Sequence, residues 1–132
     1  MKTIKILFIL SVFFSSPVLF AQTQKSVDGD WLTANKKSVI RIETDDPGES
    51  HYGKVVWLDK SVDSDKASGA LGKVMVKNLV ATGETNKYKG QVFIPRMERF
   101  NDAGFELTGD LLRVTMKVGL TIRTVEWSRK KD

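Results

Sequence analysis

Short apolar runs, each followed by turn-forming residues, are the feature that most restricts the fold of this chain. The clearest run alternates Leu112, Val114, Met116 and Val118 with polar neighbours. One face of such an extended strand is apolar and the other faces water. No long stretch shows the periodicity of an amphipathic helix. The pattern therefore predicts an all-β domain.

Nine segments have the alternation or β-branched content of strands, and turn residues such as those at 45–48, 101–104 and 109–110 separate them. Tight connections imply antiparallel strands that pair with their neighbours along the chain. A sheet with one apolar face has to cover it, and a chain of this length does so by closing into a barrel or by folding into a sandwich. The expected strands are residues 30–34, 38–44, 51–58, 73–81, 88–94, 97–101, 105–108, 111–118 and 122–128.

The first 21 residues differ from the rest of the chain. Two lysines precede an almost unbroken apolar run over residues 6–14, and Ser15 to Pro17 end that run before Ala21. This order is typical of a secretory signal peptide. We expect cleavage after Ala21, a single mature domain over residues 22–132, and export to the periplasm or the outside of the cell. An uncleaved membrane anchor is the rival interpretation, but the run is short for a span of about 20 residues.

Composition removes several classes of function. The chain has no cysteine, so it has no disulfide, no thiol nucleophile and no cysteine-based metal site. Its net charge of +5 includes two lysines of the signal segment, and the small remaining excess argues against a strong polyanion binder. Aromatic and basic residues mix over residues 87–100, but export also disfavours a nucleic-acid surface there. We expect no nucleic-acid partner and no stable membrane span after cleavage.

Recognisable catalytic motifs are missing. The sequence holds no G-x-S-x-G, H-E-x-x-H, P-loop or dinucleotide fingerprint. Its single histidine, His51, follows the acidic residues Asp45, Asp46 and Glu49, and such an imidazole could carry protons. No nucleophile or second histidine stands at a useful spacing, so an exposed turn histidine is the favoured interpretation. We expect no enzyme, no catalytic residue, no metal and no cofactor; an enzyme that uses His51 or the acidic loop 59–72 is the remote alternative.

Both ends of the expected mature chain carry residues typical of barrel closure. Gly29 precedes Trp31 near the start, and Trp127 precedes Arg129 near the end. Glycine permits a tight entry into the first strand, and a tryptophan fills one end of a barrel. An arginine from the last strand stacks on the indole and hydrogen-bonds backbone carbonyls. We expect Trp31 and Arg129 to be in contact; an ordinary buried tryptophan is the alternative.

The same residues form part of a longer pattern. Its first half consists of residues 28–33 (DGDWLT), 38–42 (SVIRI) and 52–58 (YGKVVWL). Its second half consists of residues 71–72 (LG), 90–95 (GQVFIP), 111–114 (LLRV), 119–120 (GL), 123–124 (RT) and 127–129 (WSR). The pattern resembles the small exported bacterial proteins grouped as domain of unknown function 2147. The resemblance implies an antiparallel, lipocalin-like β-barrel of about eight to nine strands in the bacterial envelope or outside it, with no established activity.

Two segments depart from the family's pattern. Residues 59–72 lack its usual Asn-Pro, and Ile94-Pro95 stands in place of Asp-Pro. The Gly-Lys-Thr-Tyr that normally follows is absent from residues 97–100. Any polar site that the family builds from these residues is therefore not carried over to this chain.

The interior of such a barrel is either filled by side chains or holds one small ligand. Our leading hypothesis is an exported barrel that binds a small, largely apolar ligand. The alternative is a solid-cored envelope interaction protein that acts through loop 59–72 or an exposed strand. The candidate ligand-lining residues are Ile40, Ile42, Tyr52, Trp57, Val114 and Met116.

Overall fold

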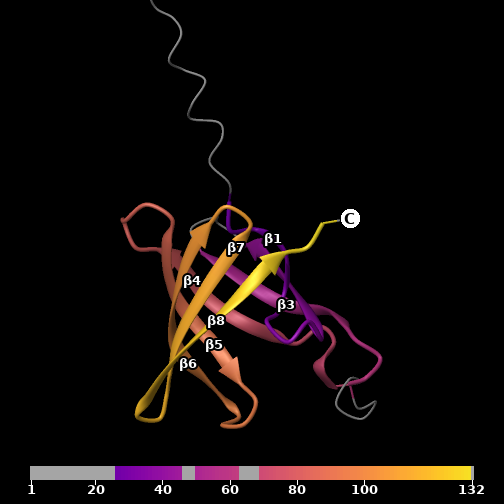
Figure 1. The fold of residues 1–132 in the computed structure, drawn as a ribbon. Coiled ribbons are helices and arrows are strands. Elements are labelled where there is room, and N and C mark those ends of the chain that lie inside the picture. The colour runs from indigo at the N-terminus through magenta and orange to yellow at the C-terminus, as the bar shows by residue number, and fades with distance from the viewer. Residues whose placement is uncertain (1–25, 46–49, 63–68, 132) are drawn as a thin grey trace, which may run out of the picture.

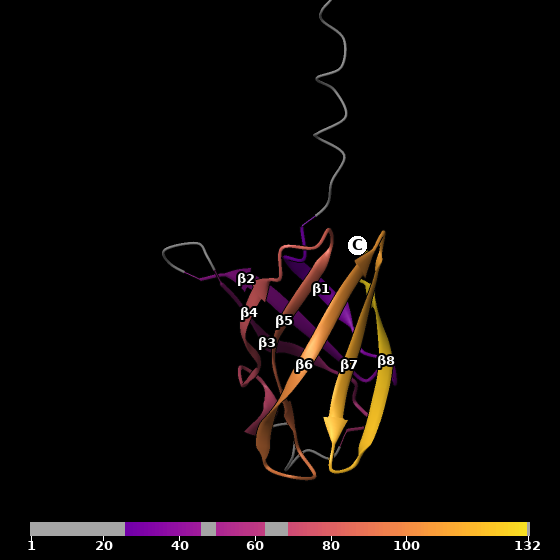
Figure 2. The same ribbon diagram turned by 90° about the vertical axis from the view of Figure 1, so that its left-hand side faces the viewer.

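The computed structural model describes residues 26–45, 50–62 and 69–131. Within these residues eight strands each pair antiparallel with the next, and β8 returns to β1, so the sheet closes into a barrel (Figures 1 and 2). The expected all-β barrel is confirmed. The strands are β1 (Gly29–Leu32), β2 (Ser38–Thr44), β3 (His51–Leu58), β4 (Val74–Ala81), β5 (Lys87–Ile94), β6 (Arg99–Thr108), β7 (Leu111–Val118) and β8 (Thr121–Arg129).

The expected signal segment, residues 1–21, and its cleavage site at Ala21 lie outside the described residues, as do residues 63–68 of loop 59–72.

β6 replaces the two strands expected on either side of residues 101–104. These residues were expected to form a turn because they include Asn, Asp and Gly, but each pairs with a residue of β5. Asp102 and Gly104 are exposed, whereas Ala103 between them is buried, so turn-type residues occupy the water-facing positions of a continuous strand. The turn lies earlier, at residues 95–98. The other seven strands begin and end within two residues of the expected bounds.

The two ends of the barrel differ. We call the end at which β2, β4, β6 and β8 finish the closed end, and the end that carries the β1–β2, β3–β4, β5–β6 and β7–β8 connections the open end; they are the upper and lower ends in Figure 1. Residues 26–28 enter at the closed end. The apolar core inside the barrel consists of Val27, Trp31, Ile40, Ile42, Val55, Val76, Leu79, Val92, Ala103, Phe105, Leu107, Leu112, Val114 and Trp127.

β1 is the shortest strand and leaves part of β8 without a neighbour. The two strands pair only through Trp31 with Arg129 and Leu32 with Ser128. β8 continues from there to Thr121 at the open end, paired on its other side with β7. In the described part of the chain, the β1-facing edge of residues 121–127 therefore has no strand partner.

Candidate functional site

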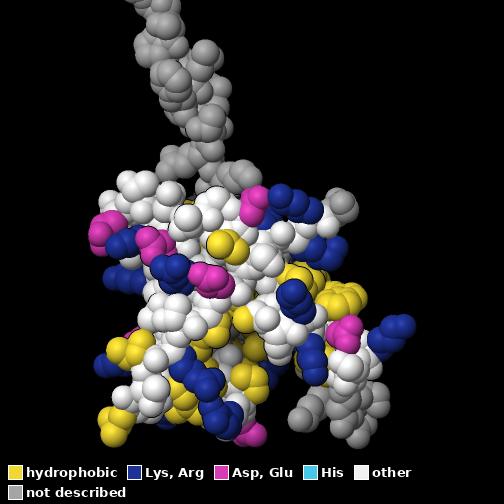
Figure 3. Space-filling model, in the orientation of Figure 1, with side chains coloured by type: hydrophobic (Ala, Val, Ile, Leu, Met, Phe, Trp, Pro, Cys, Tyr) yellow, Lys and Arg dark blue, Asp and Glu magenta, His cyan; other side chains and the backbone are white. Residues whose placement is uncertain are grey.

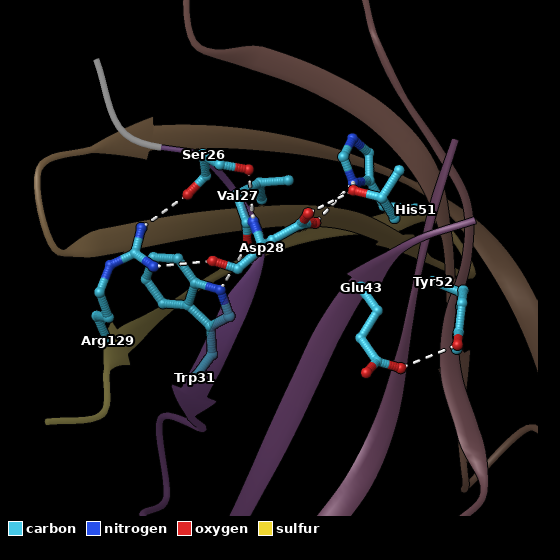
Figure 4. A network of polar contacts seen from close by, with 9 residues as sticks. Ser26, Val27, Asp28, Trp31, Glu43, His51, Tyr52 and Arg129 are labelled. Atoms are coloured by element: carbon cyan, nitrogen blue, oxygen red, sulfur yellow. Dashed lines mark hydrogen bonds and ion pairs between the residues drawn. The ribbon is translucent and has the colours of Figure 1, made fainter. Parts of the chain in front are cut away.

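Trp31 fills the closed end of the barrel. Its side chain is fully buried, and its Nε1 donates a hydrogen bond to the Val27 carbonyl at 2.9 Å. Val27 is fully buried as well, so the segment before β1 belongs to the core (Figure 4). A buried indole N–H needs such a partner, because leaving it unpaired costs about 1–3 kcal/mol. Backbone and side chain together therefore seal this end.

Arg129, from the last strand, lies over the same indole. Its guanidinium carbon is 4.4 Å from the centroid of the Trp31 ring. Nη1 donates to the Asp28 carbonyl at 3.0 Å, and Nη2 donates to the Ser26 carbonyl at 2.9 Å (Figure 4). Nε lies 3.4 Å from Oδ1 of Asp110. The expected contact between Trp31 and Arg129 is present, and the arginine also holds the backbone that enters β1.

Gly29 permits this close approach. Its φ is 131°, a conformation that side-chain-bearing residues rarely adopt. A Cβ atom at this position would also lie 2.8 Å from Nη1 of Arg129. Trp127, the fourth residue expected to close the barrel, lies elsewhere. It packs edge-on against Phe105, with ring centroids 6.5 Å apart, and lines the cavity described below.

Asp28 joins the entering segment to two further strands. Its Oδ1 lies 2.7 Å from Nδ1 of His51, and its Oδ2 accepts a hydrogen bond from the Thr44 hydroxyl (Figure 4). The His51 ring also packs against the Tyr88 ring in a T-shaped arrangement, with centroids 6.0 Å apart. His51 is thus a partnered residue at the start of β3 and not an exposed turn histidine. The three side chains come from the entering segment, the end of β2 and the start of β3, so their contacts tie these segments together.

Two polar pairs link neighbouring strands on the outer face. Arg41 donates to both carboxylate oxygens of Asp30, at 2.8 and 3.1 Å, and this bond lowers the pKa of Asp30. The Tyr52 hydroxyl donates to Oε1 of Glu43 at 2.9 Å, which raises the pKa of Tyr52 (Figure 4). Both pairs cross strand boundaries of the sheet, so they stabilise the barrel wall.

A cavity of about 990 Å³ occupies the open half of the barrel. Most of its wall is apolar, and Figure 3 shows hydrophobic side chains inside the hollow in the lower half of the molecule. The lining residues are Thr33, Ser38, Ile40, Val55, Leu58, Gly69, Ala70, Lys73, Met75, Val92, Phe93, Pro95, Arg96, Glu98 and Trp127.

The charged lining residues come from the connections at the open end. Lys73 precedes β4, and its Nζ lies 3.6 Å from the centroid of the Phe93 ring. Arg96 and Glu98 belong to the exposed turn between β5 and β6. The site thus combines an apolar body with a few charged groups at its rim, as small-molecule sites usually do.

A family model described as "Uncharacterized protein conserved in bacteria (DUF2147)" matches residues 29–129. The chain belongs to the DUF2147 family. The match runs from the first residue of β1 to the last residue of β8, so it covers the whole barrel. No curated protein and no solved structure matches the chain.

The six candidate lining residues of this DUF2147 barrel lie at different depths. Ile40 is on the cavity wall. Ile42 and Val114 are in the packed core, and Met116 is half-buried against that core. Alternation identified the inward faces of β2 and β7 correctly, but it carries no information on where the packed core ends and the cavity begins.

Tyr52 and Trp57 are not on the cavity wall. Tyr52 neighbours the buried Gly53, so it faces the other side of β3, where it binds Glu43. Simple alternation from the buried Val55 places Trp57 inside the barrel. The register with β2 shifts by one residue between these two positions, and Trp57 is 43% exposed. A bulge of this kind turns the following side chain to the opposite face.

The described residues, 26–45, 50–62 and 69–131, show neither a metal site nor a membrane-spanning helix. No group of three or more His, Asp or Glu side chains there is arranged to hold a metal ion. The same part of the chain includes no helix with the length and apolar character needed to cross a bilayer.

Proposed function

We propose that this DUF2147 protein is an exported, non-enzymatic barrel that binds a small, largely apolar ligand at its open end. The cavity is the observation that carries the proposal. Its volume of about 990 Å³ falls in the range of roughly 300–1,000 Å³ found for small-molecule sites. Burying an apolar ligand there is favourable by about 25 cal/mol for each Å² removed from water.

The residues of the wall suit an adaptable apolar site. Phe93 and Trp127 offer aromatic surfaces, and Met75 supplies a flexible, polarisable side chain that fits irregular ligands. Hydroxyls at the cavity wall pair with each other, since Oγ1 of Thr33 lies 3.0 Å from Oγ of Ser38. Because these hydroxyls already have hydrogen-bond partners, the ligand does not have to supply polar groups for them, which supports a largely apolar ligand.

A cavity-filling substitution tests the site. Met75→Trp places an indole in the cavity and should weaken binding of the uncharged probe N-phenylnaphthylamine at least about tenfold, a loss of roughly 1.4 kcal/mol. Leu111→Trp adds the same indole at an exposed position of the closed end and should leave binding unchanged. Probe fluorescence measures both affinities. Equal probe affinities for the two variants would show that the probe does not bind in the cavity and would contradict the proposal.

Native mass spectrometry of protein purified from a bacterial periplasm without detergent tests for a natural ligand. An additional mass that is lost on unfolding is expected, and organic extraction then gives its chemical class. The same spectra test export, because cleavage after Ala21 gives a protein that starts at Gln22. A protein that stays free of ligand after challenge with lipids would contradict the proposal.

The free edge of β8 favours a second candidate function, the docking of a partner strand. The Arg129 amide donates toward β7 and the Lys130 amide toward β1. By alternation, the amides of Ile122, Thr124 and Glu126 point to the edge that lacks a strand. Thr124→Pro removes one of these donors, so it should weaken the binding of a partner strand to β8 and leave probe binding in the cavity intact.

A further inference from the structure

The open end carries the most exposed apolar side chains of the described chain. Leu120, in the turn between β7 and β8, is fully exposed, and Ile122 is 65% exposed. The tip of this hairpin lies beside the turn between β5 and β6 in both ribbon views (Figures 1 and 2). Single exposed apolar residues are normal on protein surfaces. Leu120 and Ile122 differ from such isolated residues because positively charged side chains surround them.

Four cations surround this tip. Lys117 and Arg123 stand three residues before and after Leu120, and Arg96 and Arg99 come from the neighbouring hairpin. All four are exposed, and none lies within 4.0 Å of a carboxylate oxygen in the part of the chain that the structure describes.

The remaining charges around the tip do not cancel this excess. Residues 111–125 contain no Asp or Glu, and the acidic residues of the neighbouring hairpin are Glu98 in its turn and the exposed Asp102 beside Lys117, two carboxylates against four cations. The ion-paired cations, in contrast, belong to other parts of the barrel: Arg41, Lys87, Arg113, Arg129 and Lys131. Unpaired positive charge and exposed apolar surface therefore coincide at the open end.

We infer that the open end docks on an anionic lipid surface, with Leu120 and Ile122 entering the interface and the four cations facing the headgroups. At about 3.3 Å per residue along a strand, Lys117 and Arg123 stand roughly 10 Å from the tip. Interfacial elements bury their apolar face by about 5–10 Å. When Leu120 reaches the acyl boundary, both cations lie at the level of the phosphates, which attract them.

Docking in this orientation turns the mouth of the cavity toward the lipid. The inference does not depend on the cavity ligand, because Leu120 and its surrounding cations do not line the cavity, apart from Arg96. Vesicle binding and probe binding can therefore fail separately.

Vesicle co-sedimentation of the mature protein tests the inference. Vesicles of phosphatidylcholine mixed with phosphatidylglycerol should bind the protein, and vesicles of phosphatidylcholine alone should bind it much less. Lys117→Gln with Arg123→Gln should weaken binding about 30-fold, since each cation near such a surface contributes about 1 kcal/mol. Leu120→Ser with Ile122→Ser should weaken it roughly tenfold, because the apolar insertion is lost.

Matched substitutions at other exposed positions provide the controls. Leu111→Ser removes an exposed leucine at the closed end, and Lys89→Gln with Lys130→Gln removes two exposed cations away from the tip. Both controls should bind anionic vesicles as the unmodified protein does. Three results would overturn the inference: no binding to anionic vesicles, equal binding to both vesicle types, or controls that lose as much binding as the tip variants.

Discussion

Replacing Arg129 by methionine tests the closure of the barrel. Methionine keeps apolar contact with Trp31, but the carbonyls of Ser26 and Asp28 lose their charged donor. A hydrogen bond to a charged group contributes about 1.5–3 kcal/mol, and a partly buried cation–π contact adds about 1 kcal/mol. The carbonyls regain water in part, so we take the lower value for each bond. Arg129→Met should therefore lower the free energy of unfolding by about 4 kcal/mol.

Urea unfolding followed by tryptophan fluorescence measures this loss as a shift of the midpoint at constant slope. Arg113→Met is the matched control, since it removes an arginine from an ion pair with Glu126 in which the side chains are 55% and 49% exposed. Such exposed pairs contribute less than about 1 kcal/mol. Equal losses in the two variants would refute the reasoning, because Arg129 would then behave as an ordinary surface charge.

Gly29→Ala checks the same geometry independently. The positive φ alone costs a side-chain-bearing residue about 1–3 kcal/mol, and the added methyl group displaces Nη1 of Arg129. In the Arg129→Met background the steric part is relieved while the backbone strain remains. The two substitutions together should therefore cost less than the sum of their separate effects. Strict additivity would show that the guanidinium does not lie against Gly29 in solution.

Three further predictions concern the polar pairs. Asp28→Ala should lower the free energy of unfolding in urea by about 1–3 kcal/mol, because His51 and Thr44 lose their shared partner. The pKa of Asp30 is lowered by Arg41, so its stabilising effect is present above about pH 4 and is lost as the pH falls through the folded-state pKa; unfolding of Asp30→Asn and unmodified protein should converge there. Glu43→Gln should return the pKa of Tyr52 toward about 10 in a tyrosinate absorbance titration of Tyr88→Phe protein, and an unchanged value would contradict the role of the carboxylate.

Much of the fold could be predicted from the sequence because, in a strand with one apolar face, the alternation of apolar and polar residues shows which side chains face the core. β2, β3 and β7 lie where alternation and the flanking turn residues placed them. The prediction was wrong at residues 101–104, where turn-type residues occupy a strand. The prediction followed the turn-type residues Asn101, Asp102 and Gly104. It missed the alternation of Ala103, Phe105 and Leu107, which are all buried on one face of the strand. Pairing with β5 on one side and β7 on the other then overrides the preference for a turn.

The site was harder to predict for two reasons. Whether an inward residue lines the cavity depends on its position along the barrel axis, and several contacts join residues that are far apart in the sequence. Trp31 and Arg129 were expected to meet, since closure brings the first and last strands together. Ile40 and Ile42 share one face of β2, yet only the first lines the cavity. The contact between His51 and Asp28 joins positions 23 residues apart, and nothing near His51 in the sequence indicates that partner.

The contrast between a packed and an open half of one barrel leads to a final prediction about stability. Space that is retained for a ligand is not optimised for stability, so filling it commonly adds about 0.5–2 kcal/mol. Met75→Trp should therefore raise the free energy of unfolding by about 1 kcal/mol while it weakens probe binding. Met116→Trp makes the same change against the packed core, where overpacking costs about 1–3 kcal/mol, so its effect should have the opposite sign. Urea unfolding decides between the two signs: if Met75→Trp destabilises the barrel as much as Met116→Trp does, the cavity is not free space in solution, and the binding proposal loses its basis.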